Sequence, residues 1–289
     1  MKTKYIIFSA FLSGSLCFSS CTDYLDVSDE LASNLTIEQV FDNVAYTKGW
    51  HANIYNCISE YSNIFLKPNG FQNPWPMLCN ELTVAYSDAR TEMENGFTAS
   101  NAHFHRFTEM YKYIRQAHIF LERAKPLGKI SDQQNLTEED ISRMKSEAKF
   151  FIAYAYFSLF ELYGPVPIVT GVVDESQTSF DFPRATVDEQ VKYIDDLLQD
   201  VLDEDVLPHT LRYTDEATGE IKENMNEMVR PTRAVVLALR AKLWVYAASK
   251  LFNGGFPEAM DLRNPDGKQI FPAEDRAKWN IAKQHLEEF

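Results

Sequence analysis

One long stretch, Glu138–Tyr163, most constrains what this chain can fold into. Its apolar residues recur at intervals of three and four, which places them on one face of a helix. These residues are Ile141, Met144, Ala148, Phe151, Ala155, Leu159 and Leu162. From Phe150 onward the opposite face is also apolar, so we expect neighbours to cover the second half on two sides. At about 1.5 Å per residue, such a helix is about 40 Å long.

The ends of this helix are marked in the sequence. Thr137, followed three residues later by Asp140, matches a capping box, in which two side chains satisfy amides of the first turn. Gly164 permits the backbone conformation of a helix end, and Pro165 cannot continue a helix. The pattern therefore predicts a helix over residues 138–163 on which the rest of the chain packs.

Further segments carry helical signals, and they predict an all-α fold. Their ranges are Thr36–Ser59 with a bend near Gly49, Phe107–Lys125, Val187–Leu202, Arg230–Phe252 and Trp279–Phe289. Alanines along the segment 230–252 allow two helix axes to approach closely, as in stacked helical hairpins. The polar stretch Tyr213–Met228 is expected to be a loop or a turn. The acids of the segment that starts at Val187 are interpreted as charges of a solvated helix face and a helix end; they are Asp195, Asp196, Asp203, Glu204 and Asp205.

Composition and charge exclude two classes of partner. A chain of 289 residues with 45% hydrophobic residues can bury a sizeable core. Its formal net charge is −14, which argues against nucleic acid as a partner. The same charge argues against electrostatic binding to an anionic membrane surface. Any membrane attachment must therefore come from another feature of the chain.

The N-terminus supplies such a feature. Lys2 and Lys4 precede a short apolar stretch, Tyr5–Phe18, and small residues lead to Cys21. The stretch is shorter than the roughly 20 residues that span a bilayer, so residues 1–20 are interpreted as a secretory signal peptide. Cys21 then fits the lipidated cysteine of a bacterial lipobox, although Phe18 stands where leucine is usual. The alternative is ordinary secretion with Cys21 as a spare thiol.

Several motifs together resemble those of the SusD/RagB family, surface lipoproteins that capture nutrients for an outer-membrane transporter. The run from Arg143 through Glu147-Ala148 to Leu162-Tyr163-Gly164 and Val166-Pro167 resembles the signature helix of that family. Cys21-Thr22-Asp23-Tyr24-Leu25-Asp26 resembles the start of its mature chains. Arg184, Thr186 and Glu189, and later Arg230-Pro231-Thr232, match two further helix starts. Phe107 and His118 depart from the tryptophan and asparagine of the family pattern.

The resemblance implies a truncated SusD-like fold of tetratricopeptide-like helical hairpins with long irregular loops. Residues 21–225 correspond to the N-terminal domain, and residues 226–289 to an incomplete start of the C-terminal helical domain. The chain covers about the N-terminal half of the family pattern, as a fragment or a truncated gene product. We expect its last helix to expose apolar surface and the isolated chain to be less stable and prone to aggregation.

A loop region between residues 66 and 101 is the candidate ligand site. It is rich in proline, glycine and asparagine, and loops of this length often carry function. Its aromatic rings could pack on sugar faces, while its polar groups could bind hydroxyls. The candidate residues are Phe71, Asn73, Trp75, Tyr86, Asp88 and Arg90. An equally weighted alternative is that Trp75, between two prolines, only pins the loop to the scaffold.

Catalytic and metal motifs are not apparent in the sequence. It contains no P-loop, no nucleophile elbow and no dinucleotide fingerprint, so we expect neither an enzyme nor a cofactor. His103 and His105 have no third ligand at a recognisable spacing, and His118 is interpreted as a hydrogen-bonded core histidine. Cys57 and Cys79 could form a disulfide or remain free thiols.

The resemblance implies a lipid-anchored protein exposed on the cell outer membrane. It would bind an oligosaccharide and deliver it to a SusC-like TonB-dependent transporter. One alternative is a helical-repeat scaffold that recognises a protein or peptide. A third, less favoured, is a glycoside hydrolase, whose two carboxylates can lie far apart in sequence.

Overall fold

The computed structural model describes residues 35–58, 75, 79, 81, 105–129, 134–174, 176 and 181–289. The chain divides into two compact units, Met1–Asn43 and Val44–Phe289. In the first unit, the described residues contain one short helix, α3 (Ile37–Phe41). A capping box between Thr36 and Gln39 opens this helix, as the sequence predicts.

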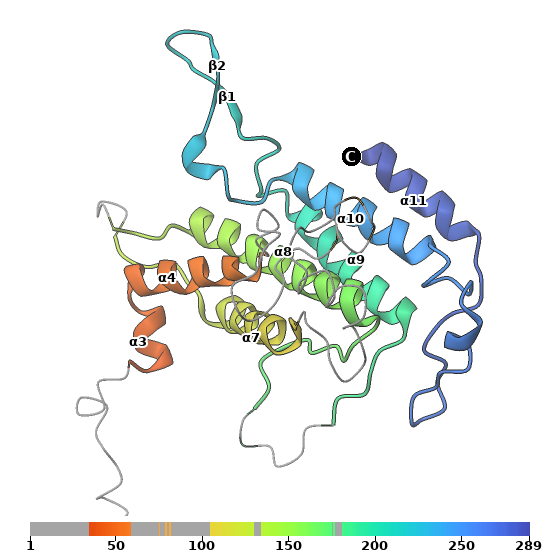
Figure 1. Ribbon diagram of the computed structural model, residues 1–289. Coiled ribbons are helices and arrows are strands. Elements are labelled where there is room, and N and C mark those ends of the chain that lie inside the picture. The colour runs from red at the N-terminus through yellow and green to blue at the C-terminus, as the bar shows by residue number, and fades with distance from the viewer. Residues whose placement is uncertain are drawn as a thin grey trace, which may run out of the picture. The chain divides into compact units, whose positions relative to one another are not determined.

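The second unit is built mainly of helices (Figure 1), which confirms the all-α prediction. Its described α-helices are α4 (Val44–Ile54), α7 (Phe107–Arg123), α8 (Glu138–Tyr163), α9 (Val187–Glu204), α10 (Arg233–Ala248) and α11 (Ala277–Glu288). Short 3₁₀ turns cover Tyr55–Cys57, Met225–Glu227 and Pro257–Ala259. The two short strands β1 (Arg212–Thr214) and β2 (Ile221–Glu223) form an antiparallel hairpin.

Consecutive helices of this unit pack side by side. Helix α7 packs on α8, α8 on α9, α9 on α10 and α10 on α11, and α4 lies against α7 and α8. Their directions alternate (Figure 1). Thus the start of α7 meets the end of α8, where the Tyr163 hydroxyl accepts a hydrogen bond from the Arg106 amide at 2.8 Å. Likewise, Arg233 at the start of α10 donates to the Leu202 carbonyl near the end of α9. The result is the stack of helical hairpins that the sequence predicts.

Helix α8 is the centre of the stack and has the bounds predicted from sequence. Thr137 and Asp140 form the expected capping box, and Gly164 ends the helix with a positive φ of 69°. Nearly every residue from Phe150 to Phe160 is buried, which confirms that neighbours cover the second half on both faces. The exception in this stretch is Tyr154, which is half-buried.

The first predicted helix is wrong in detail. The sequence predicts one helix over Thr36–Ser59 with a bend near Gly49, but the structure has a break at residues 42–43 and keeps Gly49 inside α4. At the break, the Asp42 amide makes a last helical bond to the Glu38 carbonyl, and the Asn43 amide bonds to the Val40 carbonyl at 3.4 Å in a tighter turn, which closes α3 after five residues. A Cβ at Gly49 would meet nothing within 4 Å, so this glycine fits an ordinary helical position.

Two later segments also differ from the prediction. The stretch Tyr213–Met228 is not only loop, because β1 and β2 form a hairpin that projects from the helices (Figure 1). Helix α10 begins at Arg233 with Thr232 as its cap, and it ends at Ala248 rather than near Phe252. Ser249 has an extended backbone, which stops the helix there.

The segment after α8 is extended and held down by side chains of two helices. Tyr111 donates to the Pro167 carbonyl at 2.5 Å, and the Tyr156 hydroxyl accepts from the Val169 amide at 2.7 Å. His118 is buried, with its Nε2 3.1 Å from the Val169 carbonyl. Burial lowers the pKa of His118 despite this contact. The prediction of a hydrogen-bonded core histidine is therefore confirmed.

Candidate functional site

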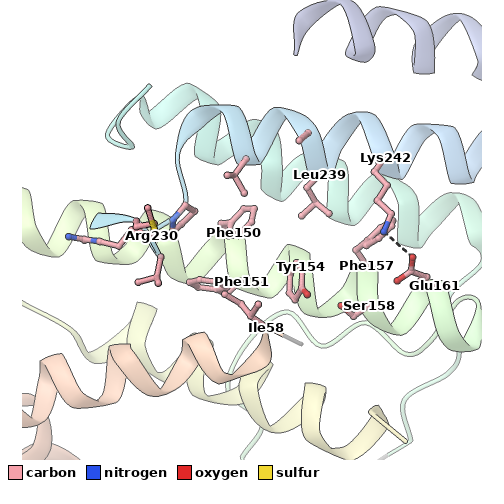
Figure 2. Close-up of a pocket in the computed structure, with 15 residues that line it drawn as sticks. Ile58, Phe150, Phe151, Tyr154, Phe157, Ser158, Glu161, Arg230, Leu239 and Lys242 are labelled. Atoms are coloured by element: carbon pink, nitrogen blue, oxygen red, sulfur yellow. Dashed lines mark hydrogen bonds and ion pairs between the residues drawn. The ribbon is translucent and has the colours of Figure 1, made fainter. Parts of the chain in front are cut away.

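A cleft lies between α8 and α10 (Figure 2). Both helices pack on α9 and touch each other only over a short stretch, which leaves room between them. The cleft has a volume of about 410 Å³. This volume lies within the range of small-molecule and side-chain pockets.

Aromatic rings from α8 form one wall of the cleft. Phe150, Tyr154 and Phe157 are three and four residues apart and therefore share a helix face. Helix α10 supplies Val235 and Leu239 to the lining, and Leu239 lies opposite these rings (Figure 2). Phe150 and Phe157 are almost fully buried, whereas Val235 is 45% exposed. The cleft thus has an aromatic floor and an aliphatic rim.

Charged side chains close one end of the cleft and satisfy each other. Lys242 Nζ lies 3.0 Å from Glu161 Oε1, and the Tyr246 hydroxyl donates to the same oxygen at 2.6 Å. Lys242 Nζ also lies 4.9 Å from the centroid of the Phe157 ring, a cation–π contact. The Glu161 side chain is 7% exposed and that of Lys242 is 50% exposed, so the lysine is the charge that faces solvent.

A buried carboxylate lies at the other end of the cleft. Glu147 of α8 has no exposed surface and accepts hydrogen bonds from Tyr55 and from Arg230 Nε, each at 2.8 Å. His51 Nε2 lies 3.1 Å and Arg143 Nε 3.3 Å from its oxygens. We call this set, completed by Glu227, the Glu147 cluster. Glu227 pairs with both arginines.

Glu147 and Arg230 both favour their charged forms. Burial raises the pKa of Glu147, but contacts with His51 and Arg230 outweigh it and hold the pKa below the ordinary value. Burial lowers the pKa of Arg230, and the neighbouring Glu147 outweighs this and raises it. Burial and the adjacent carboxylate raise the pKa of Tyr55. These contacts link α4, α8 and the segment that leads into α10.

A second cavity adjoins the first along α8. It has a volume of about 660 Å³ and is lined by residues of α4, by the first turns of α8 and by Val229. Both cavities share Ile58, Val229 and Arg230 as lining residues. The two cavities therefore adjoin each other along α8, with these three residues at their boundary, and we call the pair the α8 groove.

The ligand residues predicted from sequence are not brought together by the described structure. Trp75 is half-buried, and its backbone carbonyl accepts a hydrogen bond from the Cys79 amide at 3.0 Å. The other predicted residues lie outside the described residues, as does the predicted lipid site Cys21; they are Phe71, Asn73, Tyr86, Asp88 and Arg90. The predicted ligand set stays a prediction.

The sequence leaves open whether Cys57 and Cys79 form a disulfide or stay free thiols, and the structure decides between the two. Cys57 and Cys79 are free thiols, the first buried and the second exposed. Burial raises the pKa of Cys57 to about 12. No disulfide therefore joins these two residues in the structure.

One predicted surface acid is largely covered by a neighbouring helix. The sequence predicts Asp195 on a solvated face, but its side chain is 18% exposed, and it accepts hydrogen bonds from Arg240 Nε at 2.7 Å and Trp244 Nε1 at 2.9 Å. The reason is that α10 packs on this side of α9, which the sequence of α9 alone does not reveal.

Within the described ranges, no three His, Cys, Asp or Glu side chains lie close enough to hold a metal ion. No helix in the described parts of the chain is long and apolar enough to cross a membrane.

The sequence does not predict the α8 groove, although one charged residue in an apolar run indicates that helices meet there. Glu147 stands at the start of a densely apolar run, and a buried charge requires partners from elsewhere in the chain. The partners come from residues 51, 55, 143 and 230, a combination that no local spacing reveals.

Comparison with known proteins identifies similar sequences and folds. Residues 23–216 match a family model described as SusD-like, "Starch-binding associating with outer membrane". A solved structure named BT4246 is 21% identical, with a TM-score of 0.62 over 85% of this chain and 39% of its own. A SusD-like protein (BF3747) from Bacteroides fragilis is 18% identical, with a TM-score of 0.52 over 77% of this chain and 38% of its own.

A third solved structure is titled a laminarin binding SusD-like protein. It is 17% identical, with a TM-score of 0.50 over 73% of this chain and 42% of its own. At these identities the three structures establish the fold. The chain spans about two fifths of the length of the structures it matches. A search of curated proteins gave no match.

Proposed function

Because the chain belongs to the SusD-like family of starch-binding proteins that associate with the outer membrane, we propose that it binds glycans at the cell surface. The observation that carries this proposal is the family match over residues 23–216, which includes the whole candidate loop region. One similar structure is that of a laminarin binding SusD-like protein, which supports a glucan as the ligand class. The division into a domain over residues 21–225 and a further helical region over residues 226–289 remains part of the proposal.

The proposed partner is a SusC-like TonB-dependent transporter, to which the protein would deliver its oligosaccharide. The proposed location is the outer face of the outer membrane, with a lipid on Cys21 as the anchor. Metabolic labelling with radioactive palmitate tests the anchor: we expect label in the native chain and none in Cys21→Ser. Protease treatment of intact cells tests the surface location, since only an exposed protein is digested.

The proposed ligand contacts are the aromatic and polar residues of the loop region. The flat indole of Trp75 would pack on a pyranose ring, and this side chain is half-buried, as a stacking residue should be. Phe71 and Tyr86 would add aromatic surface. Asn73, Asp88 and Arg90 would bind hydroxyl groups.

Affinity gel electrophoresis of the full chain tests glycan binding. We expect starch or laminarin in the gel to retard the native protein, and Trp75→Ala to remove the retardation. Trp279→Ala is the matched control, because Trp279 is a 51% exposed tryptophan on α11. Native migration that neither polysaccharide changes contradicts the proposal. Equal loss in both variants contradicts the assignment of Trp75.

We propose binding without catalysis. Glu147, which is buried, is paired with Arg230, and Glu161, whose side chain is 7% exposed, is paired with Lys242. Incubation with starch or laminarin followed by chromatography should release no sugar. Release of sugar that persists after extensive purification would favour the hydrolase alternative.

A further inference from the structure

The charged side chains that line the cleft between α8 and α10 are already paired. Glu161 is bound by Lys242 and by the Tyr246 hydroxyl. Arg230 donates to Glu147 and to Glu227. A charged ligand would have to compete with these contacts, whereas an uncharged one leaves them in place. The lining therefore favours an uncharged ligand.

One buried hydroxyl in the same lining has no partner. Ser158 is 4% exposed and lies on α8 one turn after Tyr154, among the residues that line the cleft (Figure 2). Within the described part of the chain, its hydroxyl makes no hydrogen bond. A buried hydroxyl without a partner costs free energy, which a polar atom of a ligand can offset. The cleft thus offers one hydrogen bond at its wall.

Aromatic rings lie next to this hydroxyl. The ring centroids of Phe150 and Tyr154 are 6.4 Å apart and their planes differ by 31°, so a planar molecule can pack against both. Phe157 continues the same face of α8. Stacking between planar rings contributes beyond the burial of apolar area. This wall therefore favours an aromatic ligand over an aliphatic chain.

The volume of the cleft sets the size of the ligand. An apolar cavity of roughly 150 Å³ holds a benzene molecule. The cleft has a volume of about 410 Å³, which leaves room for two or three fused rings. A pyranose of similar size brings several hydroxyls that need partners when they leave water, and this mainly apolar lining satisfies them poorly.

We propose that the cleft between α8 and α10 binds an uncharged, planar aromatic molecule of two or three rings that carries a hydroxyl group. Its rings would pack on Phe150 and Tyr154, and its hydroxyl would bond to Ser158 Oγ. The exposed side chains of Val229 and Val235 would border its outer edge. This site uses one cavity alone and is separate from the proposed glycan loop, so neither proposal depends on the other.

Three small probes test the proposal on the full chain. The first is 2-naphthol, a fluorescent two-ring phenol that is uncharged at pH 7, and its fluorescence should show saturable binding. Naphthalene lacks the hydroxyl and should bind about threefold to tenfold more weakly. The anion 2-naphthoate should also bind more weakly, because the cations of the lining are already paired.

A matched pair of variants on α10 locates the site. Ala238 is half-buried and lines the cleft, so the phenyl group of Ala238→Phe would occupy part of the space. Affinity for 2-naphthol should fall about tenfold or more in this variant. Ala234→Phe is the control, because Ala234 lies one turn earlier on the same helix, is exposed and does not line the cleft. We expect unchanged affinity for Ala234→Phe and native circular dichroism spectra for both variants.

The hydrogen bond has a readout of its own. Ser158→Ala removes a single oxygen, and in this variant 2-naphthol and naphthalene should bind with about equal affinity. A preference for 2-naphthol that survives in Ser158→Ala would overturn the assignment of Ser158. Equal effects of Ala238→Phe and Ala234→Phe would overturn the location.

The nature of the occupant is tested by competition and by mass. Tighter binding of 2-naphthoate than of 2-naphthol would overturn the uncharged class of ligand. Displacement of 2-naphthol by malto-oligosaccharide would assign the cleft to sugar and overturn the proposal. A dimer in sedimentation that Ala238→Phe dissociates would overturn it in favour of a second copy of the chain.

Discussion

The Arg230 Nε atom lies 2.8 Å from Oε1 of Glu147, a carboxylate with no exposed surface. The two residues are far apart in sequence, and their contact joins the middle of the central helix to the segment that leads into α10. Because Tyr55 binds the same carboxylate, three parts of the chain meet at one charge. This contact fixes the wall that separates the two cavities of the α8 groove, since Arg230 lines both.

Removing this charge should destabilise the fold. In Glu147→Gln the guanidinium groups of Arg143 and Arg230 lose a buried anion, which typically costs about 3–5 kcal/mol. Urea denaturation should show a lower midpoint for Glu147→Gln. The control is Glu258→Gln, because Glu258 is exposed in a short 3₁₀ turn. Similar midpoints for the two variants would show that the Glu147 cluster adds no stability.

The same carboxylate should make stability depend on pH. The pKa of Glu147 in the folded protein is below its ordinary value of 4.5, so its contribution is present above pH 4.5. The contribution is lost as pH falls through the folded-state pKa. The difference in unfolding free energy between the native chain and Glu147→Gln should therefore be constant from pH 7 to about 5 and decrease in more acidic solution. A difference that grows with acid would contradict this sign.

One glycine should resist substitution because of a close backbone approach. Gly254 has φ of +73°, and a Cβ there would meet the Glu274 backbone nitrogen at 2.3 Å. Strain and the clash together should cost about 2 kcal/mol or more in Gly254→Ala. Gly171→Ala is the control, because a Cβ at Gly171 meets nothing within 4 Å. Thermal unfolding should separate the two variants by several degrees, and equal melting temperatures would contradict the close approach.

Helix α8 could be predicted to the residue because its signals are local. The capping pair Thr137 and Asp140 and the Gly164-Pro165 stop lie at its two ends, and the apolar spacing fills the interval. The break at Asp42 was missed because it depends on backbone hydrogen bonds rather than on a glycine or proline. The partners of Asp195 were missed because they come from a helix that packs on it.

The candidate site, like the fold, could be predicted from the sequence only in part. The α8 groove needs residues from α4, α8 and α10 at once, and sequence spacing cannot show which helices become neighbours. Its aromatic members Phe150 and Phe157 lie in the half of α8 that the sequence predicts to be covered on two sides, and they are buried while they also form the floor of the cleft. The loop residues of the proposed glycan site were chosen by chemical type, and their arrangement remains a prediction.

The two free thiols should differ strongly in reactivity. The thiolate is the reacting form, and burial raises the pKa of Cys57 to about 12, so Cys57 is protonated and shielded at neutral pH. Cys79 is exposed. Brief treatment of the native chain with iodoacetamide, followed by peptide mass mapping, should therefore label Cys79 and leave Cys57 unmodified. Labelling in denaturant should modify both and serves as the control. Protection of both residues that is lost only after reduction would show a disulfide and contradict the structure.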